Sequence, residues 1–216
     1  MSQFQDPEDR DKAKGRGSGF SRRGFMQSVG VTGTVAPALL GTDAQAQSTP
    51  GVMGPAAVAI VLNINGKPTK ATVEPRDTLL DVLRNQLDIT GAKRVCDRAT
   101  CGACSLLVNG KVMYGCSILA IDAQGKQITT IEGFAMTGNK PHPVVAAFVA
   151  HDAQQCGYCT PGFVVASKAF LDRTPNPTYE QVQDGLGGNL CRCGTYVGIR
   201  KAVLEAAKMM KGGSNA

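Results

Sequence analysis

The eight cysteines of this chain constrain its fold more than any other feature. Eight thiols within 216 residues indicate disulfides, zinc sites or iron–sulfur clusters, and the spacing of the thiols distinguishes among these. The first four follow the pattern Cys-x4-Cys-x2-Cys-x11-Cys, and the last four follow Cys-x2-Cys-x31-Cys-x-Cys. Their positions are Cys96, Cys101, Cys104, Cys116, Cys156, Cys159, Cys191 and Cys193. The two groups predict two separate metal centres.

The first group has a spacing that suits two bridged irons. Three thiols on one short loop can surround two irons, and the small residues between them allow backbone N–H groups to face the sulfur atoms. Structural zinc usually binds closely paired cysteines that a long spacer separates, which this pattern fits poorly. We therefore expect a 2Fe-2S cluster here, with zinc or disulfides as the alternatives.

The second group combines two short motifs. Cys-x2-Cys alone is a weak signal, because zinc ribbons and thioredoxin-like redox sites share it. Two thiolates one residue apart do not easily occupy adjacent corners of a compact tetrahedron, but they can hold one iron of a flatter two-iron cluster. Helices expected to begin at Thr160–Pro161 and at Tyr196 would direct their positive ends towards this anionic centre. We expect a second 2Fe-2S cluster here.

Residues 57–134 have the pattern of a small sheet packed on one helix. Alternating apolar residues and the Asn65-Gly66 turn signal predict a β-hairpin, and a second hairpin turns at Gly110. Between them, Asp77 is expected to cap a helix whose apolar residues recur at helical spacing. The expected strands span residues 57–65, 67–73, 105–109 and 111–114, and the apolar helix positions are Leu79, Leu80, Leu83 and Leu87.

Residues 141–212 predict an all-α domain, a four-helix bundle. Thr178 and Gln181 have the spacing of a capping box, which predicts the start of a short helix. The other expected helices span residues 144–151, 161–171 and 196–211. The whole chain is therefore expected to be α+β, with the strand-rich domain first.

Residues 1–46 have the pattern of a twin-arginine signal peptide, and residues 47–56 form the linker that follows. Arg22-Arg23 precedes Phe25 and a mildly apolar run that is too short for a stable membrane span, and Ala44-Gln45-Ala46 has the form of a cleavage site. A chance basic pair is the alternative. Because this pathway carries folded proteins, we expect the clusters to be loaded in the cytoplasm and the protein to reach the periplasm.

Charge and the remaining motifs exclude several functions. The formal charge of +6 falls to roughly +1 once the signal peptide is removed and two clusters of about −2 each are bound, so no nucleic-acid partner is expected. Neither His142 nor His151 lies at ligand spacing from a cysteine, which excludes a Rieske centre. Gly185–Gly188 follows a helix and is expected to be a turn. With no visible triad or nucleotide fingerprint, we expect no catalytic residue on this chain.

Three motifs carry a resemblance to a known family. QCGYCTPG at 155–162 and GGNLCRCGTY at 187–196, preceded by CGAC at 101–104, resemble the iron–sulfur subunit of molybdenum hydroxylases. That family includes xanthine dehydrogenase, aldehyde oxidoreductases and isoquinoline oxidoreductases. The strand-rich domain also resembles the β-grasp fold of plant-type ferredoxins. Ala99 departs from the family pattern, in which many members have a glycine that allows a positive φ; we expect the cluster to be retained.

The resemblance implies an electron-transfer subunit beside a large molybdopterin-binding subunit. That partner would oxidise an aldehyde or an N-heterocycle, and electrons would pass through the second cluster and then the first to an FAD subunit, to a cytochrome c or to another acceptor. It also implies that Gln155 and Cys193 approach the pterin, although a plain loop role is the alternative for Gln155. A free-standing 2Fe-2S shuttle and a zinc or disulfide scaffold are the other functions left open.

Overall fold

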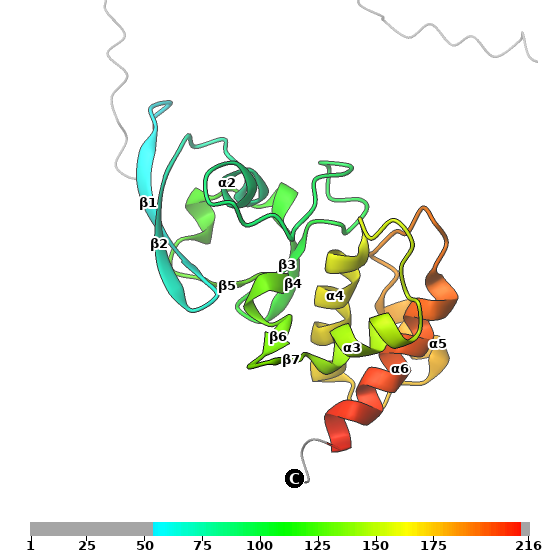
Figure 1. The fold of residues 1–216 in the computed structure, drawn as a ribbon. Helices are drawn as coiled ribbons and strands as arrows, with labels where there is room; N and C mark the ends of the chain where they lie inside the picture. The colour runs from blue at the N-terminus through cyan, green and yellow to red at the C-terminus, as the bar shows by residue number, and fades with distance from the viewer. Residues whose placement is uncertain (1–53, 213–216) are drawn as a thin grey trace, which may run out of the picture. The chain divides into compact units, whose positions relative to one another are not determined.

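A computed structural model of the chain describes residues 54–212. The predicted signal peptide, residues 1–46, lies outside the described residues, as does most of the predicted linker, residues 47–56. The described part consists of a strand-rich half, residues 54–141, followed by a helical half, residues 143–212 (Figure 1). This order confirms the expected sequence of sheet and helices.

The strand-rich half is built on one mixed sheet with the strand order β2-β1-β5-β3-β4. β1 and β5 run parallel, whereas the other neighbouring strands are antiparallel. The strands are β1 Val58–Ile64, β2 Lys67–Val73, β3 Ser105–Val108, β4 Lys111–Tyr114 and β5 Gln127–Thr129, and the helix of this half is α2 Leu79–Asn85. A separate pair, β6 Met136–Thr137 and β7 Lys140–Pro141, leads to the helical half, and short 3-10 helices span Gly115–Ser117, Ile121–Ala123 and Ile131–Gly133.

Both predicted hairpins are present, and their turns have the backbone conformation that the sequence indicates. Asn65 and Gly66 have φ of 51° and 78°, and Asn109 and Gly110 have φ of 50° and 75°. Two consecutive residues with positive φ are the pattern of the tight turn whose twist matches that of two paired strands. Local sequence therefore specifies both outer strand pairs of the sheet.

The strand β5 lies outside the predicted elements. Its three residues are too few to show an alternating apolar pattern. It joins the two hairpins: the Asn65 N–H donates to the carbonyl of Ile128, and the Asn109 N–H donates to the carbonyl of Gln127, each at 2.8 Å. Pairing with residues far away in sequence thus makes this segment a strand.

The helix α2 is capped by a different residue from the one predicted. Thr78 is the N-cap, and its hydroxyl accepts the Asp81 N–H at 3.1 Å. Asp77 instead accepts the Glu74 N–H at 2.8 Å within the preceding turn, so the prediction that Asp77 caps the helix is wrong. The apolar face of α2 is buried against the sheet, as predicted.

The strand β3 is buried on both faces and belongs to two cores. Successive side chains of a strand point to opposite faces. Leu106 packs in the core that α2 forms with the sheet, and Leu107 packs in the core of the helical half. Helix α4 lies against β3 on that second side (Figure 1). The two halves therefore share one strand between their hydrophobic cores.

The helical half contains the four predicted helices with boundaries close to those expected. Helix α5 begins with the predicted capping box of Thr178 and Gln181. Helix α6 packs against α3, α4 and α5, whereas the arrangement of the four as a regular bundle stays a prediction. The helices are α3 Pro143–Ala150, α4 Thr160–Arg173, α5 Tyr179–Gly185 and α6 Tyr196–Gly212. Within residues 54–212, no helix combines the length and the apolar character that a membrane crossing requires.

We predict that Gly162→Ala destabilises the protein although alanine favours helices. A Cβ at this position of α4 would overlap the carbonyl oxygen of Gly102 on the other half. We expect a net loss of about 1–3 kcal/mol in the free energy of unfolding, because backbone atoms must move to relieve the overlap. Urea unfolding measures this loss. Gly54→Ala is the control, since no atom lies within 4 Å of the added carbon; equal stability of the two variants would contradict the prediction.

Candidate metal centres

The first thiol group assembles around the hairpin of β3 and β4. Cys104 directly precedes β3, and Cys116 lies in the 3-10 helix that follows β4. The pairing of Ser105 with Tyr114 places the two ends of the hairpin side by side. The Sγ atoms of Cys104 and Cys116 are therefore only 3.4 Å apart.

The other two thiols of this group lie on the loop between α2 and β3. Cys101 is a neighbour of Cys96, and its side chain is one of the groups that lower the pKa of the Cys96 thiol. The Thr100 N–H donates to Cys96 Sγ at 3.4 Å, and the Ala99 N–H donates to Cys116 Sγ at 3.3 Å. Ala99 has φ of 54°, so it adopts the left-handed conformation that glycine would otherwise supply. The loop therefore directs backbone donors at sulfur despite the departure from glycine.

The second thiol group joins two loops that precede helices. Cys159 is the N-cap of α4, and Cys191 and Cys193 lie just before α6. The thiols of Cys159 and Cys191 are neighbours that interact electrostatically, and so are those of Cys156 and Cys193. The two helices begin beside the thiols, where their positive ends favour a bound anion, as expected from the sequence.

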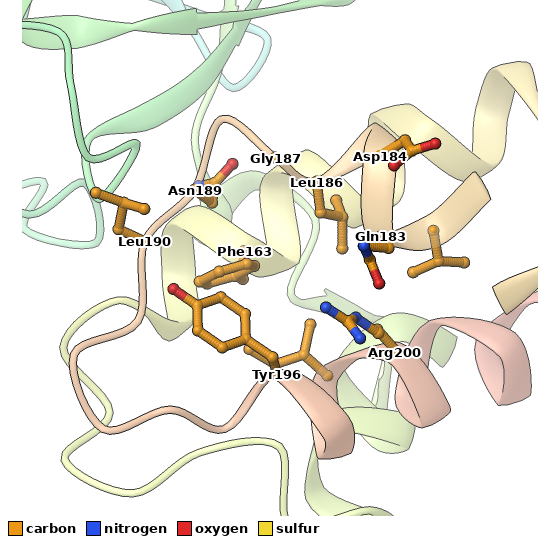
Figure 2. Close-up of a pocket in the computed structure, with 11 residues that line it drawn as sticks. Phe163, Gln183, Asp184, Leu186, Gly187, Asn189, Leu190, Tyr196 and Arg200 are labelled. Carbon is orange, nitrogen blue, oxygen red and sulfur yellow. The ribbon is translucent and has the colours of Figure 1, made fainter. Parts of the chain in front are cut away.

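A tyrosine supports the loop that carries Cys191. The Cys191 N–H donates to the Tyr196 hydroxyl at 2.9 Å, and the Cys191 Sγ lies 3.1 Å from the Thr195 hydroxyl. The Tyr196 ring stands edge-on to Phe163 with 6.2 Å between the ring centres. Figure 2 shows this pair in the wall of a pocket of about 510 Å³, with Arg200 to one side of them. The loop that carries Cys191 is therefore held in place by residues of the helical half.

The thiols meet in pairs, and this arrangement fits a two-iron cluster. A zinc ion would draw four ligands around one point. A 2Fe-2S cluster instead takes two thiolates on each iron, and backbone donors to sulfur suit its negative charge. The pairs are Cys96 with Cys101, Cys104 with Cys116, Cys156 with Cys193, and Cys159 with Cys191. The expectation that Cys191 and Cys193 hold the same iron is therefore wrong, because each of them pairs with a thiol of the other loop.

Each group combines an acidic thiol with a buried one of high pKa. Burial raises the pKa of Cys104 to about 12, and burial with the neighbouring Cys191 raises the pKa of Cys159 to about 12. Burial also acts to raise the pKa of Cys96, but backbone hydrogen bonds from Arg98 and Thr100 lower it to about 7. The pKa of Cys191 is likewise about 7, because burial, which acts to raise it, is outweighed by hydrogen bonds that include those of Thr195. A bound cation would release the proton of each high-pKa thiol.

The contacts that connect the two groups were not visible in the sequence. The Leu190 N–H donates to the carbonyl of Cys101 at 2.9 Å, and Leu190 directly precedes Cys191. The Asn189 side chain, only 5% exposed, donates to the carbonyl of Gly102 at 2.9 Å. Asn189 and Leu190 lie on the loop that approaches the strand-rich half in Figure 2. No periodicity predicts such contacts, because they join residues more than eighty positions apart in the sequence.

The remaining predicted site residues lie as follows. Gln155 is exposed beside Cys156, and Cys193 is half-buried; their approach to a pterin stays a prediction. His142 is the N-cap of α3, and its ring stands edge-on to Phe134. The glycine stretch ends α5 and leads into the loop of Cys191, as the sequence indicates.

Comparison with known proteins agrees with this arrangement. Residues 62–129 match the family model of the 2Fe-2S iron-sulfur cluster binding domain, and residues 130–204 match that of the 2Fe-2S binding domain. The aldehyde oxidoreductase iron-sulfur-binding subunit PaoA of Escherichia coli K12 is 40% identical over 172 residues, which are 73% of this chain and 75% of that protein. The small FeS subunit of nicotinate dehydrogenase from Eubacterium barkeri is 41% identical over 151 residues, which are 70% and 96% of the two chains.

A solved structure shows the same fold within a longer chain. The aldehyde oxidoreductase of Desulfovibrio gigas matches with a TM-score of 0.67 and 40% identity, covering 72% of this chain and 17% of that one. The fold and the two thiol groups are those of an iron–sulfur subunit of an oxidoreductase. The chain belongs to the family of 2Fe-2S subunits of molybdenum hydroxylases.

We predict that the thiols of one group differ sharply in reactivity in the iron-free chain. A thiol reacts as its thiolate, which forms above its pKa. Alkylation of Cys96 is expected to rise with a midpoint near pH 7, because its pKa is about 7, whereas Cys104 with a pKa of about 12 stays unlabelled through roughly pH 10. Mass spectrometry of iodoacetamide-treated protein measures both. Labelling of Cys104 in urea is the control, and a shared midpoint in the folded chain would contradict the expectation.

Proposed function

We propose that this chain is the electron-transfer subunit of a periplasmic molybdenum hydroxylase. It accepts electrons from a molybdopterin-binding partner and passes them on through two 2Fe-2S clusters, one in each half. The observation that carries the proposal is the direct contact between the loops that carry the two thiol groups. The hydrogen bond from the Leu190 N–H to the Cys101 carbonyl links one group to the residue next to Cys191 in the other. Two centres joined so closely within one fold suit the relay of electrons.

The relatives support the class of substrate. PaoA is by its name part of an aldehyde oxidoreductase, and another relative is by its name part of nicotinate dehydrogenase. An aldehyde and an N-heterocycle are therefore the two classes that we propose. Both of these relatives are by their names subunits of larger enzymes, so we propose that a separate partner supplies the molybdopterin site here.

The helical half offers a surface for that partner. Cys156 is exposed, and exposed apolar side chains occur on the same loops and at the start of α6. These side chains are Tyr158 at 49%, Leu190 at 51% and Val197 at 57% exposure. Apolar side chains gathered at a surface mark protein contacts. We place the partner here, with Gln155 and Cys193 next to the pterin.

The residues of this chain hold the centres and shield part of each from water. When bound, each 2Fe-2S cluster supplies one-electron chemistry. Oxidation of an aldehyde with water to a carboxylic acid releases two electrons and two protons, so the chain passes two electrons in succession. The N–H groups of Ala99 and Thr100 donate to sulfur, and Cys104 and Cys191 are buried. The acceptor is an FAD subunit or a cytochrome c, which an exported enzyme could reach.

We expect the holoprotein to contain about four irons per chain and, when reduced, to give two distinct EPR signals. Cys116→Ser is expected to alter or abolish one signal and to leave the other, because Cys116 belongs to the first group alone. Cys156→Ser is expected to do the reverse, so each variant is the control for the other. Zinc in place of iron, or one signal in the unmodified protein, would contradict the proposal of two clusters.

Native affinity purification from the source organism is expected to recover a larger molybdopterin-containing chain, from the periplasmic fraction. Val197→Ser should weaken that association at least tenfold while the clusters remain, because an apolar contact of about 1.5 kcal/mol or more is lost. Val61→Ser, at a side chain 49% exposed on β1, is the matched control. Recovery of the loaded chain alone would favour a free-standing shuttle, and recovery from the cytoplasm alone would contradict export.

A further inference from the structure

Thr195 occupies the start of α6 without capping it in the usual way. The Thr195 carbonyl accepts the Ile199 N–H at 3.0 Å, the first hydrogen bond of the helix. A threonine here normally turns its hydroxyl to an N–H of the first turn, as Thr78 and Thr178 do in this chain. The Thr195 hydroxyl instead lies 3.1 Å from Cys191 Sγ. Within residues 54–212, the Cys191 sulfur is the hydrogen-bond partner of the Thr195 hydroxyl.

The chemistry of the ligand fixes the direction of this hydrogen bond. A cysteine that binds iron is a thiolate and has no proton to donate. The hydroxyl of Thr195 must then be the donor and the sulfur the acceptor. Such charge-assisted bonds are stronger than neutral ones, and Cys191, 7% exposed, lies where water competes little.

The sulfur cannot easily move away from the hydroxyl. The Cys191 N–H is bound to the Tyr196 hydroxyl at 2.9 Å, and the Leu190 N–H is bound to the strand-rich half. These two bonds fix the backbone of Cys191 and of the residue before it. The backbone that carries the Cys191 sulfur is thus held in place by the fold.

We propose that Thr195 is a positioning residue that raises the reduction potential of the second cluster by donating a hydrogen bond to the Cys191 thiolate. Reduction adds negative charge to the cluster and its sulfurs, so a donor stabilises the reduced form more than the oxidised form. This inference rests on the proposed function. In the first group the donors to sulfur are backbone N–H groups, which no substitution of their own side chains removes. The second centre therefore has a donor that one substitution can delete.

The test compares Thr195→Val with Thr195→Ser in the holoprotein. Valine has the shape of threonine without the hydroxyl, and serine keeps the hydroxyl. EPR-monitored redox titration gives both potentials, with the signal of the second cluster identified by its change in Cys156→Ser. We expect Thr195→Val to lower the second potential, with about tenfold less reduced cluster at a fixed solution potential, or about 59 mV for one electron. The first potential should not move.

The controls separate this role from a structural one. Thr195→Ser is expected to keep the second potential close to that of the unmodified protein. Thr69→Val, at a hydroxyl that bonds to the Lys67 carbonyl on β2, should leave both potentials unchanged. An intact second cluster with an unchanged potential in Thr195→Val would overturn the inference and leave the proposed function untouched. Loss of the second cluster in both Thr195→Val and Thr195→Ala would also overturn the inference, because the hydroxyl would then be needed for cluster assembly. Absence of iron from the unmodified protein would instead overturn the proposed function.

Discussion

The close approach of Gly102 to Gly162 is the constraint on which the rest of the arrangement depends. Neither residue has a side chain, so the loop of the first thiol group rests directly on the first turn of α4. Asn189 then reaches the Gly102 carbonyl, and the Leu190 N–H reaches the carbonyl of Cys101. Loops that carry ligands of the two centres are thereby held by backbone contacts, which vary less in geometry than contacts between long side chains. Electron relay between fixed centres needs this kind of rigidity.

The two hydrophobic cores reinforce that contact. β3 contributes Leu106 to one core and Leu107 to the other, so a shift of the strand by one residue would remove each side chain from the core that it fills. The same strand continues from Cys104, whose position relative to Cys116 is set by the hairpin register. Packing and metal binding therefore favour the same register. The burial that stabilises the fold also raises the pKa of Cys104, so that the thiol stays protonated and unreactive until a bound cation releases its proton.

The sequence allowed the local features to be predicted and left the non-local ones hidden. Hairpins, helices and both cysteine groups depend on spacing within a few residues or on turn chemistry at residues such as Asn65 and Gly66. No local pattern predicts β5, because its partners lie far away in sequence, and local sequence does not distinguish Asp77 from the true cap Thr78, because both side chains offer a hydrogen-bond acceptor. The role of Asn189 could not be foreseen, since it depends on a carbonyl 87 residues away.

The double burial of β3 has a consequence for how such proteins can be rearranged by recombination. A strand-rich half separated from the helices would expose Leu107 to water, and the carbonyls of Cys101 and Gly102 would lose the donors that Leu190 and Asn189 supply. The two halves match separate domain families, yet in this chain they have to be inherited together. A ferredoxin domain from another protein could replace the first half only if it also brought an apolar residue to the outer face of its third strand and a glycine to meet α4.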